Sequence, residues 1–151
     1  MPDTRLPFRL PPAPAILVVM SAENVELVRA AYEAWNRGDV DAVLQYLDPD
    51  VELRDPPEAP DAQVWHGHEG YRRQLEQFMA AWAEASLEPE EIVDAGDKVL
   101  VRVHYRVRGK GQGIEAELRI FHVITLRDGK GVVIQVHGDE ARAREAAGLR
   151  P

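Results

Sequence analysis

The stretch that decides the fold is residues 99–138, VLVRVHYRVRGKGQGIEAELRIFHVITLRDGKGVVIQVHG. Apolar and polar side chains alternate along much of it with a period of two, which is the pattern of β-strands. Turn residues interrupt the pattern at 109–113 and 128–131, and a further turn precedes it at 96–97. Consecutive strands joined by such short turns pair antiparallel, so the sequence predicts a β-meander.

Upstream of residue 86 the apolar residues recur at helical spacing instead. Ser21 is expected to cap a first helix, and Gly38 to stop it. Asp39 is expected to cap a second, shorter helix that Pro49 ends. After residue 86 the period of the apolar residues changes from helical to two.

A short strand over 51–54, a proline-rich loop over 55–60 and a third helix over 69–84 complete the first half of the chain. Helices followed by an antiparallel meander define an α+β fold. We expect the curved antiparallel sheet to wrap around the three N-terminal helices.

The composition of the 151 residues is that of an ordinary globular protein, with 45% hydrophobic and 29% charged residues. The absence of cysteine excludes thiolate nucleophiles and disulfides. The net charge of −8 is spread along the chain and no basic cluster is present, so we expect no nucleic-acid partner.

Residues 1–20 differ from the rest of the sequence, because five prolines among the first 14 residues precede the apolar run Ala15–Met20. We interpret residues 1–20 as a flexible proline-rich arm and residues 21–151 as one domain. The apolar run is far shorter than the ~20 residues that span a bilayer, and it lacks the pattern of a signal peptide. We therefore expect a cytoplasmic protein with no membrane association.

Four strings stand in a characteristic order: Asn36–Asp39, Leu47–Pro56, Trp65–Gly70, and Asp139 followed by Glu145–Leu149. In order and spacing they resemble the SnoaL-like and ketosteroid-isomerase-like branch of the nuclear transport factor 2-like superfamily, over about 23–149. The resemblance implies a cystatin-like cone with an internal pocket between the concave face of the sheet and the helices. Members of this family isomerise, cyclise, hydrate, hydrolyse or only bind small molecules, so the resemblance leaves the activity open.

Asp55 is the first candidate catalytic residue. It follows the predicted strand 51–54 and resembles the general base of ketosteroid isomerase in position. A carboxylate at the mouth of a dry pocket abstracts a proton next to a carbonyl or activates a water. An aspartate before a proline is also a common turn residue, and this alternative stays open.

His122 is the second candidate. It alternates with apolar residues on the inward side of a predicted strand, an unusual place for an imidazole unless something hydrogen-bonds to it. Its position resembles that of the protonated acid of ketosteroid isomerase, so it would donate a hydrogen bond to a substrate oxygen. A hydrogen-bonded core histidine is the alternative.

Gln135 and His137 lie two apart on the last strand, and we expect both to face the pocket, His137 as a further catalytic donor and Gln135 as a ligand contact. Asp55 and His122 would complete this polar floor. The predicted ligand-binding walls are aromatic: Tyr32, Trp35, Tyr46, Phe78 and Trp82. Helical spacing alone favours ordinary core packing of these aromatic residues over contact with a ligand.

The string His66-Gly67-His68-Glu69 contains side chains that bind metals. The start of a helix explains it as well, because Glu69 suits the positive end of the helix dipole in the first turn. We expect no metal and no cofactor. The sequence thus predicts a pocket for a small hydrophobic, oxygen-bearing molecule and, if catalytic, an isomerase, cyclase or hydrolase. A non-catalytic ligand-binding module is the alternative. We also expect a homodimer through the outer sheet face, on which Phe121 and Val123 fall.

Overall fold

The computed structural model describes the backbone of residues 13–111 and 113–150, and side chains from residue 22 onward. The helices are α1 (Ala13–Asn36), α2 (Val40–Gln45), α3 (Gly67–Ala81) and α4 (Glu140–Ala146). The strands are β1 (Leu47–Arg54), β2 (Val64–His66), β3 (Trp82–Asp94), β4 (Lys98–Gly109), β5 (Glu115–Arg127) and β6 (Lys130–His137).

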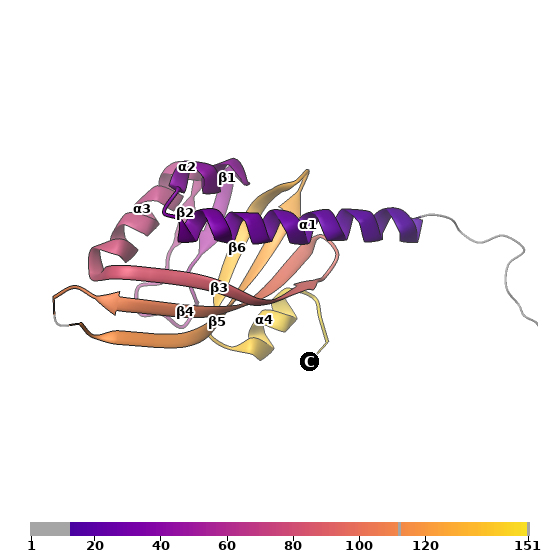
Figure 1. The fold of residues 1–151 in the computed structure, drawn as a ribbon. Helices are drawn as coiled ribbons and strands as arrows, with labels where there is room; N and C mark the ends of the chain where they lie inside the picture. The colour runs from indigo at the N-terminus through magenta and orange to yellow at the C-terminus, as the bar shows by residue number, and fades with distance from the viewer. Residues whose placement is uncertain (1–12, 112, 151) are drawn as a thin grey trace, which may run out of the picture.

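The six strands form one curved sheet in the order β2-β1-β6-β5-β4-β3 (Figure 1). The pairs from β3 to β6 are antiparallel and consecutive, so the predicted meander is confirmed. β1 joins the free side of β6 in parallel, and β2 pairs antiparallel with β1 at the edge. The predicted α+β class is confirmed as well.

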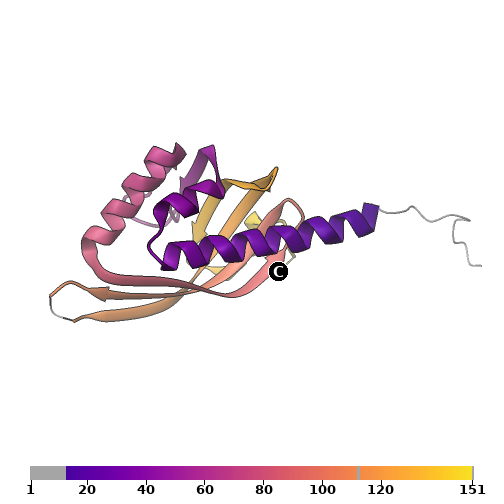
Figure 2. The same cartoon turned by 45° about the horizontal axis from the view of Figure 1, so that its top comes forward.

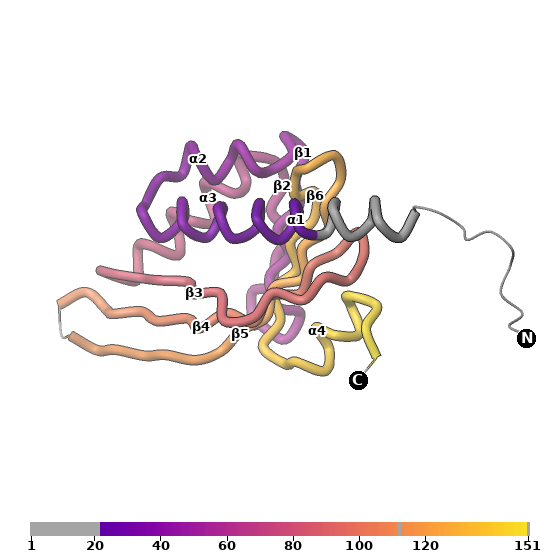
Figure 3. The backbone as a smooth tube through the Cα atoms, turned by 45° about the vertical axis from the view of Figure 1, so that its right-hand side comes forward, coloured from indigo at the N-terminus to yellow at the C-terminus, as the bar shows by residue number. Residues whose placement is uncertain are grey.

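Helices α1, α2 and α3 lie on one face of the curved sheet, and α4 lies on the other (Figures 2 and 3). Apolar side chains pack between the three helices and the sheet in two clusters, one around Tyr32 and Val101 and one around Val51 and Tyr71. A third cluster lies beneath α4. None of the helices in the described part of the chain is both long and apolar enough to cross a membrane.

The first helix begins at Ala13, eight residues before the predicted start at Ser21. Pro14 does not prevent this, because a proline in the first helical turn gives up an N–H that has no partner there. The next residues are mostly apolar, and alanine, leucine and methionine among them favour a helix. Residues 1–12, where the rest of the predicted arm falls, lie outside the described residues.

The predicted boundaries of the second and third helices were also wrong. α2 ends at Gln45, and the chain is already a strand at Leu47, ahead of Pro49. The pairing of β1 with β6 is irregular between Leu47 and Glu52, which accommodates a proline without an N–H. α3 ends at Ala81, and Trp82 is extended because it pairs with Gly109 of β4.

Phe121 and Val123 do face the outer side of the sheet, but α4 covers them. Their exposed fractions are 7% and 0%, and they pack with Ala143 and Ala147 of the helix. They are therefore not available to a second copy of the chain, and the predicted homodimer loses the observation on which it rested.

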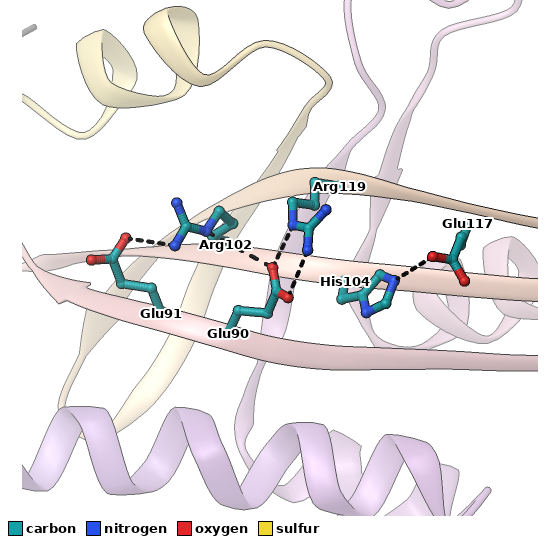
Figure 4. Close-up of polar contacts among 6 residues, drawn as sticks. All are labelled: Glu90, Glu91, Arg102, His104, Glu117 and Arg119. Carbon is teal, nitrogen blue, oxygen red and sulfur yellow. Dashed lines mark hydrogen bonds and ion pairs between the residues drawn. The ribbon is translucent and has the colours of Figure 1, made fainter.

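The part of the outer face over β3, β4 and β5 is charged (Figure 4). Glu90 accepts two hydrogen bonds from Arg119, at 2.7 and 3.1 Å, and lies 3.9 Å from Arg102. His104 lies 3.4 Å from Glu117. Opposite charges on β3, β4 and β5 are thus paired across this face, as is common for a solvated sheet face.

Candidate functional site

A cavity of about 510 Å³ lies between the concave face of the sheet and helices α1 to α3. All four tyrosines of the chain line it, together with three more aromatic residues: Tyr32, Tyr46, Tyr71, Tyr105, Trp35, Phe78 and Trp82. The strands contribute mainly aliphatic side chains, among them Leu118, Ile120, Ile124, Leu126, Ile134 and Val136. A cavity of this size and lining suits a small hydrophobic molecule.

Two side chains stand out in this lining. Among the described residues that face the cavity, Asp55 and His122 are the only ones with a carboxylate or an imidazole. Asp55 comes from the end of β1 and His122 from the middle of β5, so strands from the two halves of the chain bring them to one cavity.

Asp55 is held in place by the segment that leads into β2. Its Oδ2 accepts a hydrogen bond from the backbone N–H of Gln63 at 3.1 Å, and its own N–H donates to the Gln63 carbonyl at 3.0 Å. The indole N–H of Trp65 donates to both carboxylate oxygens, at 3.3 and 3.2 Å. Asp55 is therefore both a turn residue and a cavity residue, which unites the two alternatives that the sequence left open.

His122 is in contact with Tyr32 of α1. The Tyr32 hydroxyl oxygen lies 2.5 Å from Nδ1 of His122, and the two rings stack with centroids 5.8 Å apart and planes at 13°. Burial lowers the pKa of His122 to about 4, and the neighbouring His137 contributes in the same direction. The imidazole is therefore neutral at physiological pH.

The aromatic walls also contact one another. Phe78 meets Trp35 and Tyr105 edge to face, with centroids 6.1 and 5.8 Å apart. Burial raises the pKa of Tyr71 above its usual range, and the nearby Trp35 acts in the opposite direction. These contacts fix the shape of the cavity before any ligand enters.

The five predicted aromatic residues all line the cavity, but Tyr71, Gln74 and Tyr105 were missed. The signal for two of them was present in the sequence. Tyr71 lies on the apolar side of the predicted third helix, and Tyr105 alternates with Arg106 on a predicted strand. Gln74 carries no such signal.

The prediction that Gln135 and His137 face the cavity was wrong. In the β5–β6 pairing Val136 lies opposite His122, whereas His137 lies opposite Phe121 and Gln135 opposite Val123. Residues directly opposite each other share a face of the sheet, and a shift of one position moves a side chain to the other face. Ile134 and Val136 therefore line the cavity in their place.

His137 is instead buried on the outer side of the sheet. It is 8% exposed, and neither ring nitrogen has a hydrogen-bond partner among the described residues. Burial lowers its pKa, while the nearby Glu58 and Asp139 act in the opposite direction. It has no contact with the cavity that contains His122.

The string His66–Glu69 lies where β2 passes into α3. His66 is the residue that precedes the helix, and Nε2 of His68 lies 3.0 Å from the backbone carbonyl oxygen of Leu47. In the described part of the chain, no three His, Cys, Asp or Glu side chains come together in a way that would hold a metal ion.

A second hollow of about 720 Å³ adjoins the cavity and shares Trp35, Val43, Tyr71 and Val107 with it. Its rim carries charges of both signs from Arg37, Glu84, Arg106, Arg108 and Glu115. Arg108 and Glu84 already pair at 3.1 Å across two strands. This hollow has neither the imidazole nor the candidate base of the first.

The SnoaL-like domain family matches residues 28–134, which is most of the described chain. The chain therefore belongs to the SnoaL-like domain family, and the resemblance seen in the sequence is confirmed. No curated protein matches the chain in sequence.

Solved structures share the fold over most of this chain. An NTF2-like protein of unknown function from Burkholderia pseudomallei K96243 is 29% identical with a TM-score of 0.70, over 82% of this chain and 95% of that one. An NTF2-like protein from Burkholderia xenovorans LB400 is 31% identical with a TM-score of 0.64, over 83% and 96%. TerC, co-crystallised with polyporic acid, is 26% identical with a TM-score of 0.70, over 83% and 98%.

Proposed function

We propose that this protein binds a small hydrophobic molecule with an oxygen function in the 510 Å³ cavity and converts it without a cofactor. One observation carries the proposal: a mostly apolar and aromatic lining presents one carboxylate, Asp55, and one imidazole, His122. A few convergent polar groups in an apolar cavity are typical of sites for small molecules. The co-crystallisation of the similar TerC with polyporic acid supports a small-molecule ligand.

The chemistry that fits this pair is proton transfer next to a carbonyl. Asp55 accepts a proton from a carbon beside the carbonyl, and the electron pair of the C–H bond moves onto the carbonyl oxygen. An N–H of His122 stabilises the charge that develops on that oxygen, and this stabilisation is strong because the apolar walls exclude water. Return of the proton to another carbon completes an isomerisation, and attack of the carbanion on a second carbonyl gives a cyclisation.

His137, predicted as an alternative donor, has no part in this mechanism because it lies on the outer face of the sheet. His122 is therefore the only imidazole of the proposed site.

Binding without conversion is the second candidate function, and one observation favours it. Both oxygens of Asp55 already accept hydrogen bonds, from Trp65 and from the backbone of Gln63. These bonds are also what a carboxylate with a purely structural role in a turn would make.

Asp55→Asn separates the two functions. A thermal-shift screen of carbonyl compounds, epoxides, polycyclic aromatic compounds and polyporic acid first supplies a ligand, which raises the unfolding temperature by mass action. If Asp55 is the base, the substitution lowers turnover by ~10²-fold or more and changes Kd little, because shape and most hydrogen bonds are kept. Asp50→Asn, at an exposed position of the same strand, is the control. A ligand that wild-type protein binds but never converts would favour the binding module.

A further inference from the structure

We infer that Tyr32 is a positioning residue that holds the single ring proton of His122 on Nε2. The cavity then offers a ligand a hydrogen-bond donor at this point, and it selects molecules with an acceptor oxygen such as a ketone or a quinone. The part of the inference that concerns the ligand rests on the proposed function. The part that concerns the proton does not.

The two side chains come from distant parts of the sequence and meet in one wall of the cavity. Tyr32 lies on α1 and His122 on β5, 90 positions later. The Tyr32 hydroxyl oxygen and Nδ1 of His122 are 2.5 Å apart, and the parallel rings leave little freedom to either side chain. Such a contact is a hydrogen bond whose direction depends on which group holds the proton.

The surroundings of Tyr32 decide that direction. The side chain is 6% exposed and packs in a cluster of Val28, Leu87, Val99, Val101 and Val103. Among the described residues the only partner of its hydroxyl is His122. If Nδ1 carried the proton and donated it, the O–H of Tyr32 would have no acceptor in this apolar cluster. An unsatisfied buried donor costs about 1–3 kcal/mol.

The opposite direction satisfies both groups. Burial raises the pKa of Tyr32 well above its usual range, so the hydroxyl keeps its proton and donates a hydrogen bond to Nδ1. A neutral imidazole has one N–H and one lone pair. Because the lone pair on Nδ1 accepts from Tyr32, the N–H must be at Nε2, which is the ring group left for a ligand.

This arrangement gives the cavity a definite hydrogen-bond pattern. His122 supplies a donor, and Asp55 supplies an acceptor from the far end of β1. A carbonyl oxygen satisfies the N–H of His122. A ligand without an acceptor at this point leaves that N–H buried and unpaired, which weakens binding.

Nitrogen NMR of ligand-free protein labelled with ¹⁵N in its histidines tests which ring nitrogen of His122 carries the proton, and it needs no substrate. The signals of His122 are assigned by their loss in His122→Gln. We expect wild-type His122 to have the proton on Nε2 and a hydrogen-bonded, unprotonated Nδ1. In Tyr32→Phe we expect both tautomers to be populated, because Phe keeps the shape and removes only the hydroxyl. Tyr105→Phe, which removes another cavity hydroxyl, should leave the His122 signals unchanged.

A proton on Nδ1 in wild-type protein would overturn the inference. So would a Tyr32→Phe variant whose His122 keeps the same single tautomer. Failure of the proposed enzymatic function would appear only in turnover, so the two failures are distinguishable.

The ligand class is tested with fluorenone and its parent hydrocarbon fluorene, which differ in one acceptor oxygen. We expect wild-type protein to bind fluorenone about tenfold more tightly than fluorene, and Tyr32→Phe to lose most of that preference. An equal preference in wild-type and Tyr32→Phe protein would contradict the role of Tyr32 in selecting the ligand.

Discussion

His122 is a neutral imidazole whose cross-strand neighbours are Val101 and Val136. Its pKa is about 4 in the folded protein and returns to about the ordinary 6.5 on unfolding. As the pH falls below 6.5, His122 becomes protonated in the unfolded chain but stays neutral in the folded protein. The free energy of unfolding therefore falls between about pH 6.5 and pH 4, by up to about 3 kcal/mol from this residue, and it is fully retained above pH 6.5.

Urea denaturation between pH 4 and pH 8 measures this contribution as a difference between variants. We expect His122→Gln to remove that part of the pH dependence. His66→Gln, at an exposed position, should keep the pH dependence of wild-type protein. An unchanged pH dependence of the free energy of unfolding in His122→Gln would show that burial does not lower the pKa of His122 in the folded protein.

At the scale of single elements, β5 and β6 show why one strand could be oriented from the sequence and the other could not. In β5 apolar residues flank His122 at two-residue spacing, and Glu117 and Arg119 mark the other face, so the inward face was predicted correctly. In β6 apolar residues occur at both parities, as in Val132, Val133 and Ile134. Helices cover both faces of β6, so both faces carry apolar side chains. The alternation of apolar and polar residues therefore does not show which of them face the cavity.

The register of β6 is set by tertiary contacts instead. The pairing with β5 is irregular between Thr125 and Leu126, beside the tight turn that joins the two strands. An extra residue at such a point exchanges the faces of everything beyond it. The predicted ends of the second and third helices were wrong for a similar reason. Leu47 and Trp82 continue the helical pattern of the sequence, but in the structure they pair with neighbouring strands.

The docking of α4 on the sheet is open to a direct test. We expect Phe121→Ala to lower the free energy of unfolding by about 3 kcal/mol or more, since it empties a site packed against the helix. Ile114→Ala, at a side chain that is 64% exposed, should change it by less than about 0.5 kcal/mol. Equal small effects in denaturant titrations would mean that α4 does not cover Phe121.

For the molecule as a whole, the class of fold and the inward positions of His122 and the aromatic residues could be predicted, because they follow from periodicity. The cavity itself and the place of Asp55 in it were expected from the family resemblance. The contact between Tyr32 and His122 could not be predicted, since it depends on how α1 lies across the sheet. The sequence pattern also could not predict that α4, a helix of seven residues, covers part of the outer face.

The central claim is that the cavity beneath α1 is the ligand site, and the measurement that tests it most directly is the affinity of fluorenone for a variant in which the cavity is filled. Ala31 lines the cavity, whereas Ala34, one turn further along α1, is 1% exposed in the close-packed core. We expect Ala31→Phe to change the free energy of unfolding by no more than about 1 kcal/mol, because the new ring enters empty space. Ala34→Phe is the matched control for overpacking and should cost about 1–3 kcal/mol.

By isothermal titration we expect fluorenone to bind wild-type protein and to lose affinity by about 100-fold or more in Ala31→Phe, since the ring occupies the volume that the ligand needs. Folded Ala31→Phe protein that binds fluorenone as tightly as wild-type protein would contradict the account, because the ligand would then lie outside the cavity of Asp55 and His122.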